Sequence, residues 1–116
     1  MVNLKKTEML KKNYEINKVI KQGKFYSGHY LSVFLLPNNE EINYICFSVT
    51  KKTGNSVIRN KIKRKLRENY RQIEENISLG YSIVVIWKKT IDAENATFEN
   101  IKNDFESVFR KANLLK

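Results

Sequence analysis

Basic side chains crowd one short segment of this 116-residue chain, and their types favour contact with phosphate groups. Residues 51–71 carry nine Lys or Arg side chains and one acidic side chain, within a chain whose net charge is +10. Lys is used far more often than Arg, yet four of the five arginines lie between Arg59 and Arg71. Arg offers a planar fork that binds two phosphate oxygens at once, which Lys cannot do. This concentrated charge indicates a polyanionic partner.

The same segment has the spacing of an amphipathic helix. At about 100° per residue, an apolar stripe forms on one side. Its members are Ile58, Ile62, Leu66, Tyr70 and Ile73. The opposite side gathers Asn60, Lys63, Arg64, Arg67 and Arg71. A solvated surface helix usually interleaves Glu with Lys four residues apart, whereas Glu68 stands alone here. An ordinary solvated face is the alternative, but its like charges would repel one another unless a polyanion neutralised them.

The turn before this helix strengthens the phosphate interpretation. Lys51 and Lys52 precede Gly54 and the helix start, where Asn55 or Ser56 can act as the N-cap. The free N–H groups and the dipole of a helix N-terminus favour a bound phosphate. A glycine at this place can also serve turn geometry alone, so the turn supports the basic helix and does not stand by itself.

Two predicted strands, residues 29–36 and 43–50, present a second candidate surface. Alternate residues suit the core, namely Leu31, Val33, Leu35, Ile45, Phe47 and Val49. The other set is partly polar and partly aromatic: Tyr30, Ser32, Phe34, Tyr44, Cys46 and Ser48. Aromatic rings on an open sheet face beside basic residues form a platform for stacking single-stranded bases. The alternative is ordinary packing of these rings beneath a helix.

The remaining pattern predicts one α+β domain over residues 1–116, a two-layer α/β sandwich with a mixed sheet and the order α-β-β-(β)-α-β-α. A first helix over residues 7–22 ends at Gly23, and a short extra strand lies near residues 24–26. After a turn at Pro37, residues 43–50 pair back on residues 29–36. The basic helix runs from Asn55 or Ser56 to about Ile77. A strand over residues 81–88 and a last helix from Thr97 complete the order.

Several classes of function are disfavoured by the composition. Cys46 and His29 are the only residues of their types, so we expect no internal disulfide, no metal-ligand cluster and no catalytic residues in the protein. The beginning of the chain has no signal-peptide pattern, and no apolar run is long enough to span a bilayer. We therefore expect a cytoplasmic protein without a membrane partner.

Residues 48–68, SVTKKTGNSVIRNKIKRKLRE, resemble the signature of the bacterial ribonuclease P protein component family, S-V-S-K-K-x-G-N-A-V-x-R-N-R-x-K-R-x-x-R-E. Either Leu4-Lys5-Lys6 or Leu10-Lys11-Lys12-Asn13 suits the N-terminal pattern of the family. The helix end at Gly23, the chain length and the element order also agree with the family. The resemblance covers essentially the whole chain, although only the basic segment is specific. It implies a fold similar to domain 2 of ribosomal protein S5.

The resemblance implies a subunit of the endoribonuclease that removes the 5′ leader from precursor tRNA. Hydrolysis would be carried out by the RNA subunit, which requires Mg²⁺, and the partners would be ribonuclease P RNA and precursor tRNA, with no DNA. The residues implied in RNA binding are Lys51, Lys52, Asn55, Arg59, Asn60, Lys61, Lys63, Arg64, Arg67 and Arg71. The leader would lie in a cleft between the first helix and the sheet, lined by Ile16, Ile20, Tyr30, Phe34 and Ser48.

This chain departs from the family pattern in two places. Ile16 and Ile20 stand where the family often has aromatic residues, and an aliphatic side chain cannot stack on a base as a ring does. Lys61 replaces a common Arg, which keeps the charge but loses the fork.

Two other functions remain open at this point. A non-catalytic RNA-binding module, such as a ribosomal or assembly protein, fits the composition equally well. A DNA-binding protein fits less well, because no second helix-turn-helix element accompanies the basic helix.

Overall fold

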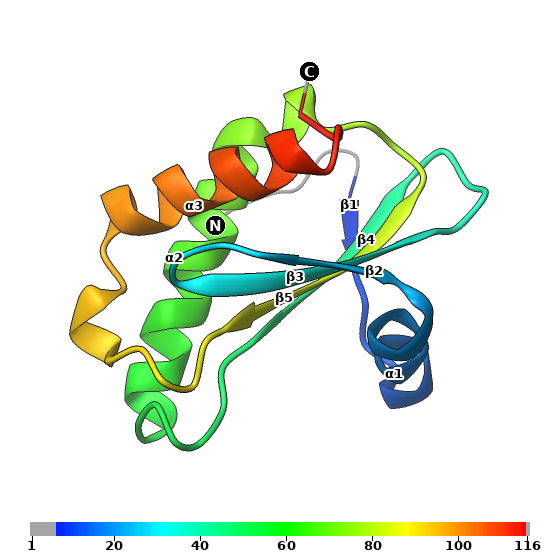
Figure 1. The fold of residues 1–116 in the computed structure, drawn as a ribbon. Helices are drawn as coiled ribbons and strands as arrows, with labels where there is room; N and C mark the ends of the chain where they lie inside the picture. The colour runs from blue at the N-terminus through cyan, green and yellow to red at the C-terminus, as the bar shows by residue number, and fades with distance from the viewer. Residues whose placement is uncertain (1–6, 116) are drawn as a thin grey trace.

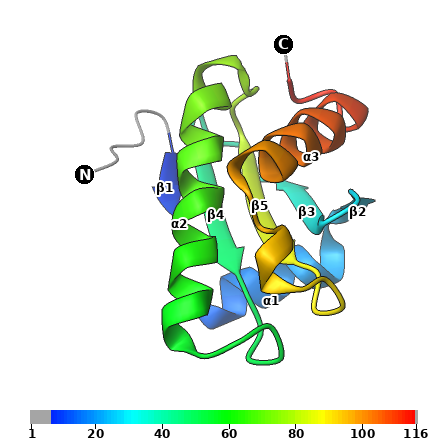
Figure 2. The same ribbon diagram turned by 90° about the vertical axis from the view of Figure 1, so that its left-hand side faces the viewer.

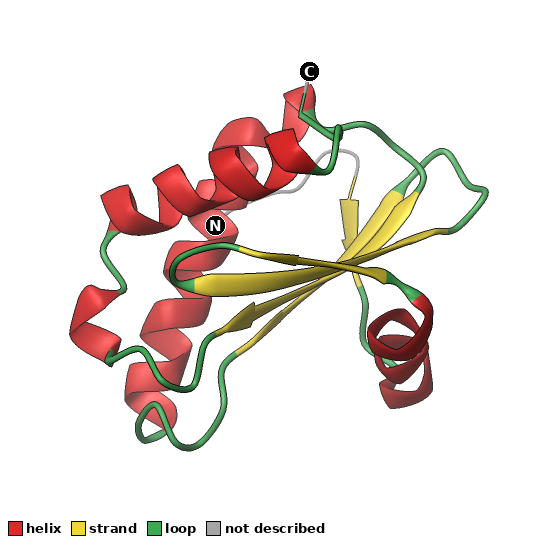
Figure 3. Ribbon diagram, in the orientation of Figure 1, coloured by secondary structure: helices red, strands yellow, loops and turns green. Residues whose placement is uncertain are grey.

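The computed structural model describes residues 7–115, and this part of the chain folds into three α-helices and one five-stranded sheet (Figure 1). In chain order the elements are β1 (Thr7–Met9), α1 (Asn13–Gln22), β2 (Lys24–Ser27), β3 (Leu31–Pro37), β4 (Asn43–Ser48), α2 (Ser56–Ile73), β5 (Tyr81–Trp87) and α3 (Phe98–Lys111). Single 3-10 turns follow α2 (η1, Glu74–Asn76) and precede α3 (η2, Ala93–Asn95). Figure 3 shows that the sheet lies between helices on its two faces.

The sheet is mixed, as the sequence predicted, and its strand order is β1-β4-β5-β3-β2. The strand β3 runs antiparallel to both β2 and β5, whereas β4 runs parallel to both β5 and β1. The helix α2 is the crossover that joins the parallel strands β4 and β5. The strand β2, which forms a hairpin with β3, confirms the short extra strand expected near residues 24–26.

The prediction that residues 43–50 pair back on residues 29–36 is wrong. The strand β5 lies between β3 and β4, so that Phe34 and Cys46 both pair with Val84. The turn at Pro37 does reverse the chain. Turn residues, however, report only a local change of direction, and the pairing depends on a strand that comes more than thirty residues later.

The predicted first helix is also wrong at its beginning. Residues Thr7–Met9 form β1, which pairs with Asn43–Ile45, and the helix begins only at Asn13. Pairing with β4 and a buried 2.8 Å hydrogen bond between Thr7 Oγ1 and the Tyr70 hydroxyl hold these residues in the sheet. Tertiary contacts therefore override the local pattern that favoured a helix.

The predicted ends of the other helices agree closely with the structure. Asn55 caps α2 by accepting a hydrogen bond from Ile58 N, and Thr97 caps α3 in the same way from Asn100 N. The helix α2 ends at Ile73, earlier than the predicted Ile77, because the chain tightens into the 3-10 turn η1.

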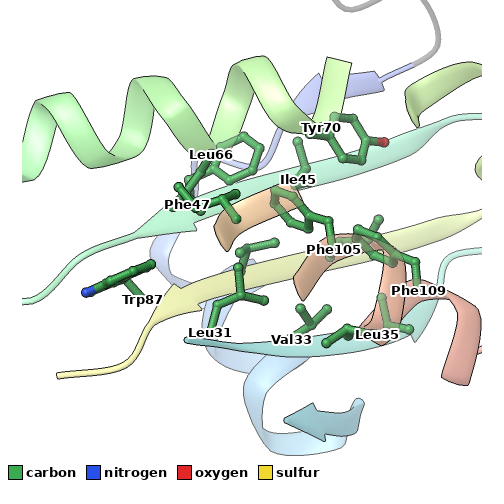
Figure 4. Close-up of a cluster of buried hydrophobic side chains, with 14 of the residues drawn as sticks. Leu31, Val33, Leu35, Ile45, Phe47, Leu66, Tyr70, Trp87, Phe105 and Phe109 are labelled. Atoms are coloured by element: carbon green, nitrogen blue, oxygen red, sulfur yellow. The ribbon is translucent and has the colours of Figure 1, made fainter. Parts of the chain in front are cut away.

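The main core lies between the sheet and the layer formed by α2 and α3 (Figures 1 and 2). All six residues predicted for the core from strand alternation are buried in it. Figure 4 shows side chains of β3 and β4 beside Leu66 and Tyr70 of α2 and Phe105 and Phe109 of α3; those labelled on the strands are Leu31, Val33, Leu35, Ile45 and Phe47. The α+β class is thus confirmed, with two helices and the sheet forming its principal layers.

The helix α1 lies on the opposite face of the sheet (Figure 1). A smaller apolar cluster forms there around the buried residues Leu10, Val19 and Val84. The other apolar members of this cluster are only partly buried: Ile16, Phe34, Leu36, Tyr44, Cys46 and Ile86. A ten-residue helix therefore covers this face incompletely and leaves accessible side chains beside it.

Candidate nucleic-acid interface

The helix α2 is amphipathic in the way its sequence predicted. Ile62, Leu66 and Tyr70 are buried against the sheet and α3. On the other side, Asn60, Arg64, Arg67 and Arg71 are exposed and Lys63 is half-buried. We call these five residues the basic face of α2. Within residues 7–115, none of its four cationic side chains forms an ion pair with an acidic side chain, so their charges are available to a partner.

The turn before α2 places further predicted residues at one end of the basic face. Lys51 and Lys52 are exposed, and the Asn55 side chain is occupied in capping Ile58 N at 3.0 Å. Arg59 Nε donates to the Gly54 carbonyl at 3.2 Å, which folds this side chain back over the turn. Arg59 is half-buried and retains its terminal guanidinium nitrogens for a ligand.

Lys61 is exposed but does not lie on the basic face. At the helical spacing it shares a flank with Lys65, whose ammonium group donates to the Ala96 carbonyl beside α3 at 2.9 Å. The structure therefore separates Lys61 from Asn60 and Arg64, although all three belong to one sequence motif.

The basic face of α2 borders the edge of the sheet. An Arg67 guanidinium nitrogen lies 4.0 Å from the Met9 sulfur on β1. In the described part of the chain β1 pairs only with Asn43–Ile45. The later half of β4 pairs with β5 on one side and has no strand on the β1 side. Burial raises the pKa of the Cys46 thiol, and the nearby charge of Lys63 partly offsets this effect. Lys63 is therefore close to a residue that lies on the α1 side of the sheet.

The α1 side brings together most of the predicted leader residues. Ile16 and Phe34 pack in the same cluster with Cys46 and Ile86. Ser48 is half-buried, pairs with Ile86 and lies two residues beyond Cys46, which places it on the same face of β4. We call this set, Ile16, Phe34, Cys46, Ser48 and Ile86, the α1-side surface. Ile20, in the last turn of α1, is 36% exposed.

Tyr30 does not belong to the α1-side surface. Its ring stacks on Trp87 in the main core, with centroids 6.0 Å apart and planes 9° apart. Strict alternation would place Tyr30 on the same face as Phe34. Tyr30 precedes the first residue of β3, however, and the alternation of side chains does not extend beyond the strand.

An aromatic residue that the sequence analysis missed lies beside Phe34. Phe25 on β2 is the cross-strand partner of Phe34, with ring centroids 5.1 Å apart, and it is 56% exposed. The strand β2 has only four residues, which is too short to reveal an alternating pattern. The signal available in the sequence was a ring next to Lys24 in a segment without acidic residues.

The other flank of α1 borders a hollow of about 570 Å³ against the β3–β4 turn. Glu15 and Glu40 both line it, and Tyr44 donates a 3.1 Å hydrogen bond to Glu40 Oε1. This hydrogen bond is the main reason why the pKa of Tyr44 is raised. Lys18 lines the hollow as well, so the lining has two carboxylates and one ammonium group, and it contains none of the predicted leader residues.

Within residues 7–115 no group of three or more His, Cys, Asp or Glu side chains is arranged to hold a metal ion. In the same residues no helix has the length and apolar character needed to cross a membrane.

The family model and the sequence relatives indicate the same family. The family model for ribonuclease P matches residues 4–113. The ribonuclease P protein component of Natranaerobius thermophilus is 37% identical, over 92% of this chain and 91% of that protein. The corresponding protein of Clostridium botulinum is 38% identical, over 96% of this chain and 94% of its own length.

Solved structures agree with the sequence relatives. The ribonuclease P protein of Staphylococcus aureus superimposes with a TM-score of 0.79 at 34% identity, covering 93% of this chain and 97% of that one. The Thermotoga maritima protein has a TM-score of 0.80 at 26% identity, with 90% and 96% covered.

The family model matches nearly the whole chain, the sequence relatives exceed 30% identity and the solved structures have the same fold. The chain belongs to the ribonuclease P protein family, the protein component of the endoribonuclease that matures the 5′ end of tRNA.

Proposed function

We propose that the chain binds ribonuclease P RNA through the basic face of α2 and holds the 5′ leader of precursor tRNA on the α1-side surface. The observation that carries this proposal is the adjacency of the two surfaces. Arg67 of the basic face lies 4.0 Å from the Met9 sulfur, and the next residue, Leu10, is buried in the apolar cluster on the α1 side. The charge of Lys63 also acts on the Cys46 thiol of the α1-side surface. One RNA-bound face and one leader-bound face would thus meet at the edge of β4.

The basic face is suited to the backbone of a folded RNA. Its three arginines are exposed, Lys63 is half-buried, and none of the four has an acidic partner among the described residues, so binding would not have to break an existing ion pair. Each phosphate that they neutralise would release condensed counterions, which favours association. Lys51 and Lys52 would extend this contact across the turn before α2.

The α1-side surface is suited to a single strand. Phe34 is only half-buried and offers a ring, Ser48 offers a hydroxyl group, and Ile16 offers an apolar contact. Unpaired bases bind such surfaces by stacking, provided that cations lie close enough to contact the backbone. Lys63 and the adjoining basic face supply these cations.

The protein would support the reaction without performing the bond cleavage. We propose that Mg²⁺ is bound by the RNA subunit, where it would activate water and stabilise the charge that develops on the phosphate. The protein's own side chains would reduce repulsion between the two RNAs and fix the leader, and these tasks fit a chain working in the cytoplasm.

A cleavage assay at low Mg²⁺ tests the proposal. Ribonuclease P RNA from the same source would be incubated with precursor tRNA, with and without the protein. We expect the protein to restore 5′ maturation that the RNA alone does not achieve. Polylysine at equal charge concentration is the control for a general cation effect. Binding without any gain in cleavage would leave only a generic RNA-binding module.

The leader part of the proposal has a separate test. Phe34→Ala in the reconstituted holoenzyme should weaken binding of precursor tRNA about fivefold or more, because one stacked base is lost. Binding of mature tRNA, which has no leader, should not change. Equal losses for the two RNAs would contradict a leader site at Phe34.

A further inference from the structure

We propose that Phe25 is an additional base-stacking residue, which extends the leader-binding surface from Phe34 onto the edge strand β2. This inference rests on the proposed function and adds a contact that the sequence motif does not contain.

The geometry places both rings on one face of the sheet. Phe25 and Phe34 are directly opposite each other on β2 and β3, and cross-strand partners point to the same side. Their centroids are 5.1 Å apart and their planes are inclined by 51°. Phe34 packs in the cluster beneath α1, so Phe25 also faces the α1 side.

The exposure of Phe25 leaves its ring open to a ligand. A single exposed apolar residue is common on protein surfaces and carries no function by itself. Phe25 differs because it is 56% exposed and also adjoins a ring of the proposed leader surface. A base stacked on Phe25 would continue a row of contacts that begins at Phe34.

The charge around Phe25 favours a polyanion. No acidic residue occurs between Glu15 and Glu40, and Lys18, Lys21 and Lys24 are exposed in this interval. Stacking rings bordered by cations are the pattern that binds single-stranded nucleic acid. The same lysines disfavour a second copy of the chain at this edge, because a charged edge strand resists pairing with itself.

The helix α1 and the strand β2 adjoin in the chain. Gly23 joins the two elements directly, and Ile20 in the last turn of α1 is 36% exposed. Ile16 and Ile20 provide apolar area without rings, so aromatic stacking on this side of the molecule falls to the strand residues Phe25 and Phe34. Phe25 thus supplies an aromatic ring on the side of the molecule where α1 has the aliphatic residues Ile16 and Ile20.

The test uses the reconstituted holoenzyme and precursor tRNAs that carry either a long leader or a leader of one nucleotide. Phe25→Ala and Phe25→Leu should bind the long-leader precursor about fivefold to tenfold more weakly than the wild type, as expected for one stacked base. Both should bind the one-nucleotide precursor normally. Phe25→Tyr should restore binding, and Phe98→Ala is the matched control, because Phe98 is 45% exposed but lies on α3.

A fluorescent adenine analogue placed along the leader gives an independent signal. Stacking on Phe25 should quench it at one leader position, and Phe25→Ala should remove that quenching. Full affinity in Phe25→Leu would show that no ring is needed and would overturn the proposal. A change in the sedimentation of the free protein on Phe25→Ala would also overturn it, since the patch would then be a contact between copies.

The leader surface and the role of Phe25 can be contradicted separately. If Phe34→Ala weakens long-leader binding and Phe25→Ala does not, the proposed leader surface stands and the role of Phe25 is wrong. If the wild-type holoenzyme does not distinguish long from short leaders, the leader surface itself is wrong.

Discussion

Asp104 on α3 is a buried carboxylate that fixes the turn between β2 and β3. It is 5% exposed. Its Oδ1 accepts a hydrogen bond from His29 N at 2.9 Å, and its Oδ2 accepts from Tyr30 N at 2.7 Å and Leu31 N at 3.0 Å. One side chain thus satisfies three consecutive backbone donors where the turn enters β3. It ties the hairpin that carries Phe25 and Phe34 to the helix layer.

We expect Asp104→Asn to lower the free energy of unfolding by about 2–4 kcal/mol. The amide keeps the shape of the carboxylate but replaces one acceptor oxygen with a donor that faces backbone N–H groups. Urea denaturation measures the loss. Asp92→Asn makes the same chemical change on the exposed loop and should leave the midpoint unchanged. An unchanged midpoint in Asp104→Asn would show that these hydrogen bonds contribute little.

Arg64 tests the basic face at a single residue. Arg64→Glu should weaken binding to ribonuclease P RNA about tenfold and flatten the dependence of log affinity on log salt, because phosphate contacts are lost. Lys102→Glu on α3 applies the same change of charge at another exposed position. Filter binding across a salt series compares the two variants. Equal losses would mean that net charge, and not the basic face, determines affinity.

At the scale of the elements, α2 could be predicted from the sequence, whereas the pairing of the strands could not. The apolar period, the cap at Asn55 and the missing acidic residues are all local to α2, so a single stretch of sequence contains them. The strand β1 has three residues, and its partner β4 begins more than thirty residues later. The insertion of β5 between β3 and β4 likewise depends on packing across the whole sheet.

The candidate site likewise contains residues that could be predicted from the local sequence and residues that could not. The predicted RNA-binding residues of α2 follow from one helix, and among them Lys61 shares a flank with Lys65 and lies away from the basic face. The leader residues depend on which face each strand residue takes. Tyr30 lies just outside β3 and turns into the main core, while Phe25 comes from a strand too short to show a pattern. The face on which each of these two side chains lies could not be predicted without the register of the sheet.

Gly23 is the one residue that connects α1 to β2, and its close contacts hold the end of α1 near β3. A Cβ at this position would be 2.5 Å from the Val19 carbonyl oxygen and 2.7 Å from the Leu35 carbonyl oxygen. Both obstacles are backbone atoms, so Gly23→Ala must displace the end of α1 from β3. The cost of such overpacking is about 1–3 kcal/mol.

The displacement of α1 should affect one function and spare the other. We expect Gly23→Ala to reduce the preference for long-leader over one-nucleotide precursor tRNA, while affinity for ribonuclease P RNA alone stays near that of the wild type. Gln22→Ala changes the adjoining exposed residue and is the control. If leader preference and affinity for ribonuclease P RNA fall together, Gly23 supports the whole fold and not only the position of α1.

At the scale of the whole molecule, the basic face of α2 and the α1-side surface meet at the β4 edge of the sheet, and they offer different kinds of interaction. In the proposed function the basic face of α2 binds through charge, and residues 51–71 hold most of the excess charge of the chain. The α1-side surface and Phe25 would bind through rings and apolar contacts. Salt weakens the first kind of interaction steeply, because it opposes counterion release, but it has little effect on stacking.

The two surfaces should therefore respond differently to salt in one experiment. As salt rises, the affinity of the protein for ribonuclease P RNA should fall steeply. In preassembled holoenzyme, the ratio of affinities for long-leader and one-nucleotide precursors should change much less, because that ratio isolates the leader contact. Measuring both quantities over the same salt series separates the surfaces without mutation. A ratio that falls as steeply as the affinity itself would mean that the leader is held through its phosphates, and the rings of Phe34 and Phe25 would lose their assigned role.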